Sequence, residues 1–279
     1  MTRVLSALVL IPLVVGTIWF LPSRATLVLA VLGAFLAFLE YAAIAAAMGI
    51  VVSRPVGGTA VILVAYAVWF GGQLSDVTTP HGDPFLQPEL AHLVLMSALI
   101  VAGAIGVAAA RPLPGALADV SATLFAPIYI GLPLGALANV RSSLLGGREA
   151  LLLLMFVIVT SDSAQYYTGR AFGRRPLAPA ISPKKTREGA IGGLVFGTLA
   201  MIAGGRWVFP STTIAVLALV GATLAALGIV GDLFESLLKR SAGIKDSSQL
   251  IPGHGGVLDR IDSWLFAAPV YYVFVRYLA

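Results

Sequence analysis

Long apolar runs are the feature that most limits what this chain can fold into. Of its residues, 58% are hydrophobic and only 11% are charged, and the mean hydropathy is +0.94. A helix needs about 20 apolar residues to cross a hydrocarbon core about 30 Å thick. The sequence therefore predicts an all-α, polytopic helical membrane protein with about nine transmembrane helices. We expect them near residues 4–21, 25–48, 56–72, 90–110, 116–138, 150–169, 189–208, 212–235 and 262–278.

Nothing in the pattern of these runs indicates a second domain. No low-complexity linker or internal repeat divides the 279 residues. We expect a single integral membrane domain over 1–279, with hydrophobic N-terminal spans in 1–150 and catalytic spans and cytoplasmic loops in 151–279. The first run begins like a signal peptide, but the residues from Trp19 to Pro22 offer no small-residue cleavage site, so we expect it to be retained.

The positive charges favour one orientation in the membrane. Nine spans put the two termini on opposite sides, and lysines and arginines gather on the cytoplasmic side of membrane proteins. With the amino terminus inside, 13 of the 18 lysines and arginines are cytoplasmic. Both polar stretches discussed below, 160–190 and 232–262, then also face the cytoplasm, where nucleotides are found.

Several kinds of site are excluded by composition. The chain has no cysteine, which rules out disulfides, thiol nucleophiles and Cys-ligated metals. It has three histidines and no HExxH motif, so we do not expect a His-rich zinc centre. The net charge of +5 comes from loops and not from a basic tail, so we expect contact with anionic lipids and no nucleic-acid partner.

The stretch 232–262 concentrates ionisable residues between two apolar runs, and such residues near a bilayer usually mark a functional site. A continued helix would align Asp232 with Glu235, Ser236 and Lys239 on one face. The simpler alternative for this stretch is a basic cytoplasmic loop that orients the protein.

The end of this stretch resembles a cation and phosphate site. Asp259 and Asp262 are three residues apart where the last run begins, so they share a helix face and can converge on one cation. Mg²⁺ favours a few carboxylates together with waters and substrate phosphates. The Gly-rich reversal 252–256 offers backbone amides to phosphate oxygens. Two alternatives stay open: Asp259 as a carboxylate favoured by the helix dipole, and His254 as an ordinary turn residue.

A second polar stretch covers 161–193. Asp162 and Gln165 lie one helical turn apart, and a Lys-Lys-Thr-Arg run at 184–187 precedes an apolar helix. Basic residues ahead of a helix N-terminus suit a polyphosphate. The chain has no GxxxxGK[ST] motif, so any nucleotide is held without a P-loop. A positive-inside loop is the alternative interpretation of these bases.

The 27 residues of 236–262 resemble the signature of phosphatidate cytidylyltransferases, the integral membrane CDP-diacylglycerol synthases. That pattern runs S-x-(apolar)-K-R, four residues, K-D, then P-x-H-G-G-(apolar)-x-D-R-(apolar)-D. All of its fixed positions are met, by Ser236, Lys239, Arg240, Lys245, Asp246, Pro252, His254, Gly255, Gly256, Asp259, Arg260 and Asp262. The block ISPKKTREGAIGG also resembles the family, and the similarity runs from about 160 to 265. Gln165 is a departure, because many members have a small residue there.

The resemblance implies transfer of a cytidylyl group from CTP to phosphatidate, giving CDP-diacylglycerol and pyrophosphate. It also implies a homodimeric helical protein in a prokaryotic inner or plasma membrane, a requirement for Mg²⁺, and leaves a second cation open. We assign the metal to Asp232, Asp259 and Asp262, and catalysis to these three with Lys239. The candidate substrate-binding residues are Asp162, Ser182, Lys184, Lys185, Thr186, Arg187, Ser236, Arg240, Lys245, Asp246, His254, Gly255, Gly256 and Arg260.

Two rival functions were weighed against this one. A CTP-dependent polyprenol or phytol kinase would use a similar membrane site but has no reason to match 236–262 so fully. An ion-coupled transporter would spread ionisable groups through the depth of the bilayer. Here Glu40 alone lies well inside a predicted span, and the other ionisable residues gather at one interface.

Overall fold

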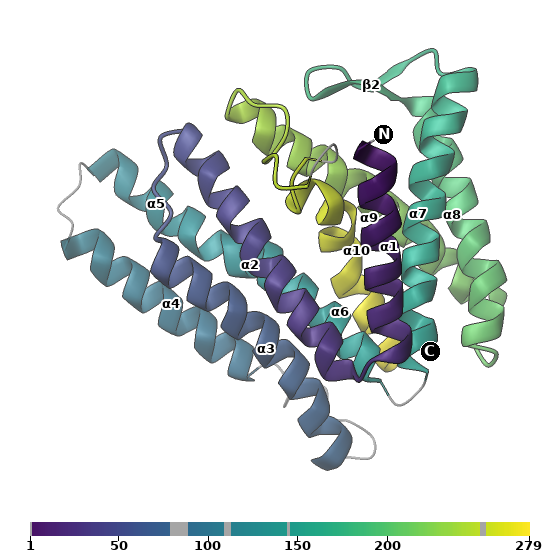
Figure 1. The fold of residues 1–279 in the computed structure, drawn as a ribbon, viewed down its shortest axis with the longest axis horizontal. Helices are drawn as coiled ribbons and strands as arrows, with labels where there is room; N and C mark the ends of the chain where they lie inside the picture. Colours follow the sequence, from purple (N-terminus) through teal and green to yellow (C-terminus); the bar gives the residue numbers. More distant parts are fainter. Residues whose placement is uncertain (1, 79–88, 109–112, 144–145, 252–254) are drawn as a thin grey trace. The chain divides into compact units, whose positions relative to one another are not determined.

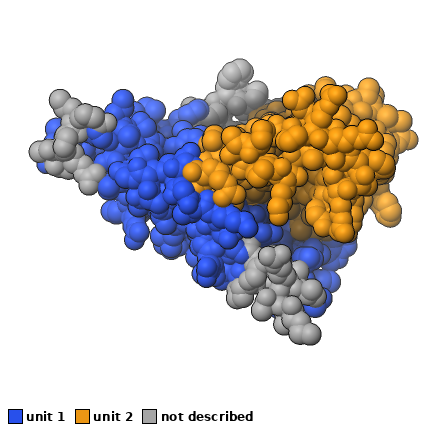
Figure 2. Space-filling view, turned by 90° about the horizontal axis from the view of Figure 1, so that it is seen from above, with its two compact units in different colours: residues 1–142, 241–260 blue, residues 143–240, 261–279 orange. Residues whose placement is uncertain are grey.

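The computed structural model describes residues 2–78, 89–108, 113–143, 146–251 and 255–279, and its described residues are almost entirely helical (Figure 1). Internal contacts divide the chain into two compact units (Figure 2). Unit 1 comprises 1–142 and 241–260, and unit 2 comprises 143–240 and 261–279. The prediction of an all-α, polytopic membrane protein is confirmed.

The predicted spans coincide with helices. Each of the nine apolar runs falls on a described helical segment, and seven such segments are long and apolar enough to cross a membrane. In α1 (Thr2–Phe20) the residues Leu8–Phe20 form an apolar stretch, and this helix is not among the seven. Helix α10 (Leu258–Tyr277) begins with three charged residues within five positions and is not among the seven. The number nine therefore stays a prediction.

Unit 1 is a bundle built around α3. Its elements are α1, α2 (Ser23–Ala47), α3 (Arg54–Thr78), α4 (Glu89–Ala108), α5 (Leu113–Ala126), the π-helical turn η1 (Pro127–Gly131) and α6 (Leu132–Ser142). A Cβ added at Gly131 or Gly135 would lie 2.6 Å from the backbone oxygen of Val61 or Ala65 on α3. Only glycine allows this close approach, so these two positions set the packing of η1 and α6 on α3.

The segment from α5 to α6 forms one long interrupted helix. Pro127 has no backbone N–H, so the regular ladder of hydrogen bonds is broken there and a π-helical turn takes up the change. On α6, Asn139 Nδ2 donates to the Val68 oxygen at 2.8 Å. The buried Arg141 donates from Nε to the Ile18 oxygen at 2.8 Å and from Nη2 to the Leu21 oxygen at 2.9 Å. Arg141 thus satisfies carbonyls at the end of α1, which have no partner within their own helix.

Unit 2 carries a β-hairpin between two closely packed helices. Its elements are α7 (Gly147–Phe172), β1 (Pro176–Ala178), β2 (Ser182–Thr186), α8 (Arg187–Val208), α9 (Ile214–Ser241, as far as residue 240) and α10 from residue 261. Glycines on α8 face α7: a Cβ at Gly193 would lie 3.0 Å from the Ser161 oxygen, and one at Gly189 would lie 2.8 Å from the Gln165 oxygen. This packing holds the start of α8 against the end of α7, and therefore fixes the hairpin between them (Figure 1).

Candidate active site

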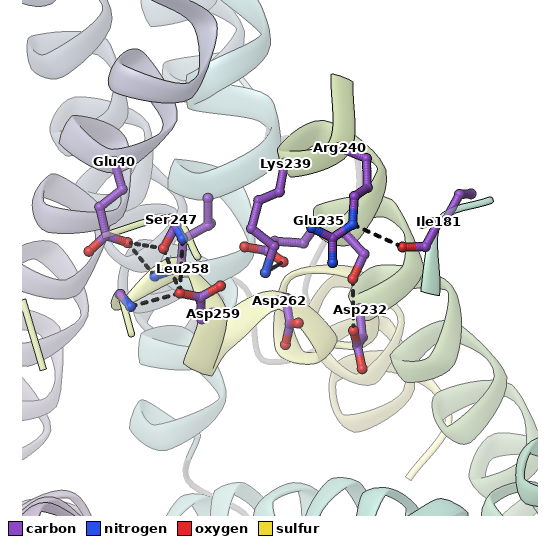
Figure 3. Close-up of polar contacts among 12 residues, drawn as sticks. Glu40, Ile181, Asp232, Glu235, Lys239, Arg240, Ser247, Leu258, Asp259 and Asp262 are labelled. Atoms are coloured by element: carbon purple, nitrogen blue, oxygen red, sulfur yellow. Dashed lines mark hydrogen bonds and ion pairs between the residues drawn. The ribbon is translucent and has the colours of Figure 1, made fainter. Parts of the chain in front are cut away.

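Unit 2 brings charged residues together from four elements. Lys185 on β2 forms an ion pair with Asp232 on α9. The Lys185 side chain is 22% exposed and the Asp232 side chain is 33% exposed. Asp162 on α7 and Asp262 on α10 lie close enough for their charges to interact with Asp232 and with Lys185. Figure 3 shows Asp232 and Asp262 near one another. The sequence predicted three of these positions as cation or phosphate ligands, and Asp162 as a substrate contact.

Local sequence explains how these residues meet. A Cβ at Gly231 would lie 2.5 Å from the backbone oxygen of Asp262, so glycine at this position lets the start of α10 approach α9. Asp262 Oδ1 accepts a hydrogen bond from the Ser263 amide at 2.6 Å. Asp162 Oδ1 accepts one from Gln165 Nε2 at 3.1 Å, as their spacing of one helical turn predicts. Gln165, the departure from the family pattern, therefore contacts the carboxylate of Asp162, one of the charged residues that meet here.

The hairpin that presents Lys185 is held at both ends. The Glu188 carboxylate accepts hydrogen bonds from the backbone amides of Arg174, at 3.0 Å, and Arg175, at 3.3 Å. Thr186 Oγ1 accepts from the Gly189 amide at 3.1 Å and caps α8. Arg240 Nε donates to the Ile181 oxygen at 3.3 Å (Figure 3). Arg240, which we assigned to a phosphate, therefore also fixes the turn of the hairpin.

Exposure differs from residue to residue along β2. Lys184 is exposed and Lys185 is half-buried, while Ser182 and Thr186 are also half-buried. Arg187 is exposed at the start of α8. The Lys-Lys-Thr-Arg run does precede a helix N-terminus, as predicted, but the short strand that carries it was not predicted. Residues 171–175 and Glu188 line a pocket of about 400 Å³ beside the hairpin.

A buried ion pair lies one turn further along α9. Glu235 is fully buried (0% exposed) and pairs with Lys239, which is itself buried. Ser236 Oγ lies 3.5 Å from Asp232 Oδ1, so the predicted shared helix face is present. Lys239 was predicted to bind phosphate or to organise the carboxylates. Its contact with Glu235 is one that the sequence analysis did not assign.

We expect the Glu235–Lys239 pair to matter for stability. Replacing Glu235 by Gln leaves a buried ammonium without its counter-charge, which costs about 3–5 kcal/mol in buried pairs. The melting temperature of the purified variant in detergent should fall accordingly. In the double variant Glu235→Gln/Lys239→Met, most of the loss should be recovered because no lone charge remains. A wild-type melting temperature for Glu235→Gln alone would contradict this role.

The carboxylates of unit 2 fit a magnesium ion that is completed by other ligands. Within the described ranges, no group of three or more His, Asp or Glu side chains forms a ready-made ligand set. Mg²⁺ is usually bound through one or two carboxylates, with waters and substrate phosphates filling the other positions. Asp232 and Asp262, with Asp162 nearby, could supply this partial set, and the single Lys185 ammonium at Asp232 offsets only part of their combined negative charge.

Asp259, the third predicted metal ligand, belongs to unit 1 and organises a turn there. Its Oδ2 accepts hydrogen bonds from the Ser247 amide at 3.1 Å, from Ser247 Oγ at 2.8 Å and from the Gly256 amide at 2.7 Å. It also lies in the first turn of α10, as the dipole-based alternative expected. Its role as a cation ligand stays a prediction.

The other predicted residues of the signature differ in exposure, and His254 lies outside the described residues. Lys245, Asp246 and Arg260 are exposed. Gly255 has a φ of +83°, a conformation that favours glycine, and so belongs to the expected reversal. Gly256 is buried. The prediction for His254 lies outside the described residues.

Comparison with known proteins identifies the family of this chain. A family model described as the cytidylyltransferase family matches residues 1–278. The chain is 47% identical over 129 residues to a phosphatidate cytidylyltransferase of Haemophilus influenzae (44% of this chain, 45% of the relative). It is 46% identical over 122 residues to one of Pseudomonas aeruginosa (43% and 45%), and 43% identical over 132 residues to the uncharacterized protein YnbB of Escherichia coli (47% and 44%).

These matches span about half the length of the curated relatives. The family model, in contrast, extends over nearly the whole chain, including the N-terminal helices that the signature itself does not reach. The chain therefore belongs to the cytidylyltransferase family.

Proposed function

We propose that the chain transfers the cytidylyl group of CTP to phosphatidate and releases pyrophosphate. The observation that supports this most is the meeting of Lys185, Asp232, Asp162 and Asp262 within one unit. Bases beside carboxylates suit a polyphosphate and its counter-cation. Two of the relatives are themselves named phosphatidate cytidylyltransferase, which supports the same reaction.

The reaction needs no nucleophile from the protein. A phosphate oxygen of phosphatidate attacks the α-phosphorus of CTP, one P–O bond forms, and the bond to the β-phosphate breaks. The chain has then to align the two phosphates and to offset their charge, as in other phosphoryl transfers. Lys185, near the end of β2, is suited to this task. Asp232 holds its ammonium in place, and the ammonium can also bind a polyphosphate. The exposed Lys184 and Arg187 add positive charge beside it in the sequence.

The proposed cation is Mg²⁺, held by Asp232 and Asp262, with Asp259 as the third assigned ligand and a second cation left open. When bound, it neutralises phosphate charge that the lysines alone leave uncompensated. We place the site on the cytoplasmic side of a prokaryotic inner or plasma membrane, because CTP is cytoplasmic and the positive charges favour that orientation. A homodimer in contact with membrane lipids completes the proposal.

Labelled substrates test the reaction class directly. Purified protein in phosphatidate-containing vesicles with Mg²⁺ should transfer label from cytosine-labelled CTP into lipid, and only when phosphatidate is present. Pyrophosphate should appear in equal amount. A kinase would instead place the γ-phosphate label in a lipid and release CDP. Finding γ-label and no cytosine label in the lipid would reject the proposed reaction.

A further inference from the structure

Glu40 is an ionisable residue buried in an apolar helix of unit 1. It lies on α2 and is 5% exposed, and Ala37, Phe38 and Ile44 of the same helix are also buried. A buried carboxylate is costly unless hydrogen bonds compensate for the lost water. The proposed reaction uses no group at this position, so its burial needs another explanation.

Among the described residues, the compensation comes from partners more than 200 positions away in the sequence. Oε1 accepts hydrogen bonds from Ser248 Oγ at 2.7 Å and from the Val257 amide at 2.9 Å. Oε2 accepts them from Ser247 Oγ at 3.0 Å and from the Leu258 amide at 2.7 Å. A carboxylate has about four acceptor positions, so all of them are used. Figure 3 shows Glu40 facing Ser247 and Leu258.

These four donors belong to what we call the signature loop, defined as Ser247–Ile251 together with residues 255–258. Ser247 and Ser248 stand at its beginning, and Val257 and Leu258 stand where α10 starts. One side chain therefore fastens both ends of the loop to α2. The two amides are among those that a helix N-terminus leaves without partners, so the negative charge of Glu40 is favourable there.

The contact continues from Glu40 to Asp259. Ser247 Oγ lies 3.0 Å from Glu40 Oε2 and 2.8 Å from Asp259 Oδ2, and its single hydroxyl hydrogen is shared between the two carboxylates. Gly256 fits closely against Ser247 and Glu40, because an added Cβ would collide with both Ser247 Oγ and Glu40 Oε2. Glu40 thus constrains the position of an aspartate that belongs to the matched family pattern.

We propose that Glu40 is a positioning residue, which fixes the signature loop and the first turn of α10 for the transfer reaction. This inference rests on the proposed function, since the aligned groups are those assigned to catalysis. The hydrogen bonds of Glu40 are made to the signature loop. It acts through Ser247 and the amides of Val257 and Leu258, so its loss should affect the rate of the bound complex more than the binding of CTP.

The test replaces Glu40 by Gln, which keeps the size but turns one acceptor oxygen into a donor. The kcat should fall by roughly 10–100-fold, the effect typical of residues that hold ligands in place, with a KM for CTP within a few-fold of wild type. Hydrogen exchange should accelerate at the Val257 or the Leu258 amide, because each oxygen of Glu40 accepts from one of these amides and one oxygen becomes an NH₂ group. The milder Ser248→Ala, which removes one of the four donors, should shift both readouts in the same direction by less.

Tyr41→Phe is the matched control. Tyr41 is the next residue on α2 and is also buried, and its hydroxyl donates to the Ala122 oxygen at 3.0 Å and not to the signature loop. The Tyr41→Phe variant should keep kcat, and the hydrogen exchange of the Val257 and Leu258 amides, close to wild type. An equal loss of kcat in Tyr41→Phe and Glu40→Gln would overturn the proposal, as would unchanged exchange at both amides in Glu40→Gln. If wild-type protein transfers no cytidylyl group, the proposed function fails, and the exchange measurement still decides whether Glu40 holds the loop.

Discussion

Replacing Asp262 by Asn is expected to lower kcat by roughly 10²–10³-fold or more, the loss seen when one charge-stabilising group is removed from an active site. Asn has nearly the same shape and can still accept the Ser263 amide bond, so the start of α10 should keep its structure. The variant loses only the negative charge that faces Asp232 and Lys185. The measurement is cytidylyl transfer at saturating CTP and over a range of Mg²⁺ concentrations.

Glu149→Gln provides the control for Asp262→Asn. Glu149 also belongs to unit 2, but it is exposed in the first turn of α7, far along that helix from Asp162. It loses the same charge without touching the cluster, so its activity should equal that of wild type. Both variants should remain folded and inserted, as judged by elution in detergent and by melting temperature. Normal turnover of Asp262→Asn at saturating Mg²⁺ would remove Asp262 from the proposed cation site.

The helices could be predicted from the sequence because apolar runs of one span's length leave few alternatives in a bilayer. Details within the helices could not. The segment predicted as one span at 116–138 is interrupted by η1, which follows from Pro127, but its close packing on α3 depends on which backbone lies opposite Gly131 and Gly135. That information is tertiary and leaves no local pattern.

The hairpin at 176–186 shows a second limit. Both strands contain a proline and β2 also contains two lysines, and these residue types are uncommon in strands. The hairpin forms because α7 and α8 bring its ends together and Glu188 binds the amides of Arg174 and Arg175. Sequence spacing alone indicated that the lysines precede a helix. It could not indicate that Lys185 turns to Asp232 while Lys184 stays exposed.

Glu40 and Glu235 illustrate what sequence reasoning misses at a site. Glu40 was noticed as a lone acid within an apolar span, and that signal suited an ion pathway. Its partners in the signature loop, 207 to 218 residues away, explain it without one. Glu235 shared a predicted helix face with Lys239, and the face was correct, but burial of the pair depends on the surrounding helices. The signature itself identified the family because its spacing is specific.

The difference between two neighbouring lysines leads to the second large expected effect. Lys185→Met should lower kcat by roughly 10²-fold or more, because the ammonium that faces Asp232 also supplies charge where the proposed polyphosphate binds. Lys184→Met removes the same charge from the neighbouring, exposed residue of the hairpin. Since exposed charges are screened by salt and water, it should mainly raise the KM for CTP, by a few-fold.

Two further variants separate a local role of Lys185 from a general loss of positive charge. Arg206→Gln removes an exposed charge from the last turn of α8, at the far end from the hairpin, and should leave both kcat and KM unchanged. Asp232→Asn should be as inactive as Lys185→Met. The double variant should be no less active than the less active of the two single variants, because the effects of residues that act as a unit do not add. Two results would contradict this role of the ion pair: equal losses of activity in Lys184→Met and Lys185→Met, or losses at Lys185 and Asp232 that multiply in the double variant. In either case the ion pair is not the feature that aligns the nucleotide, and the basic run acts only as a screened positive surface.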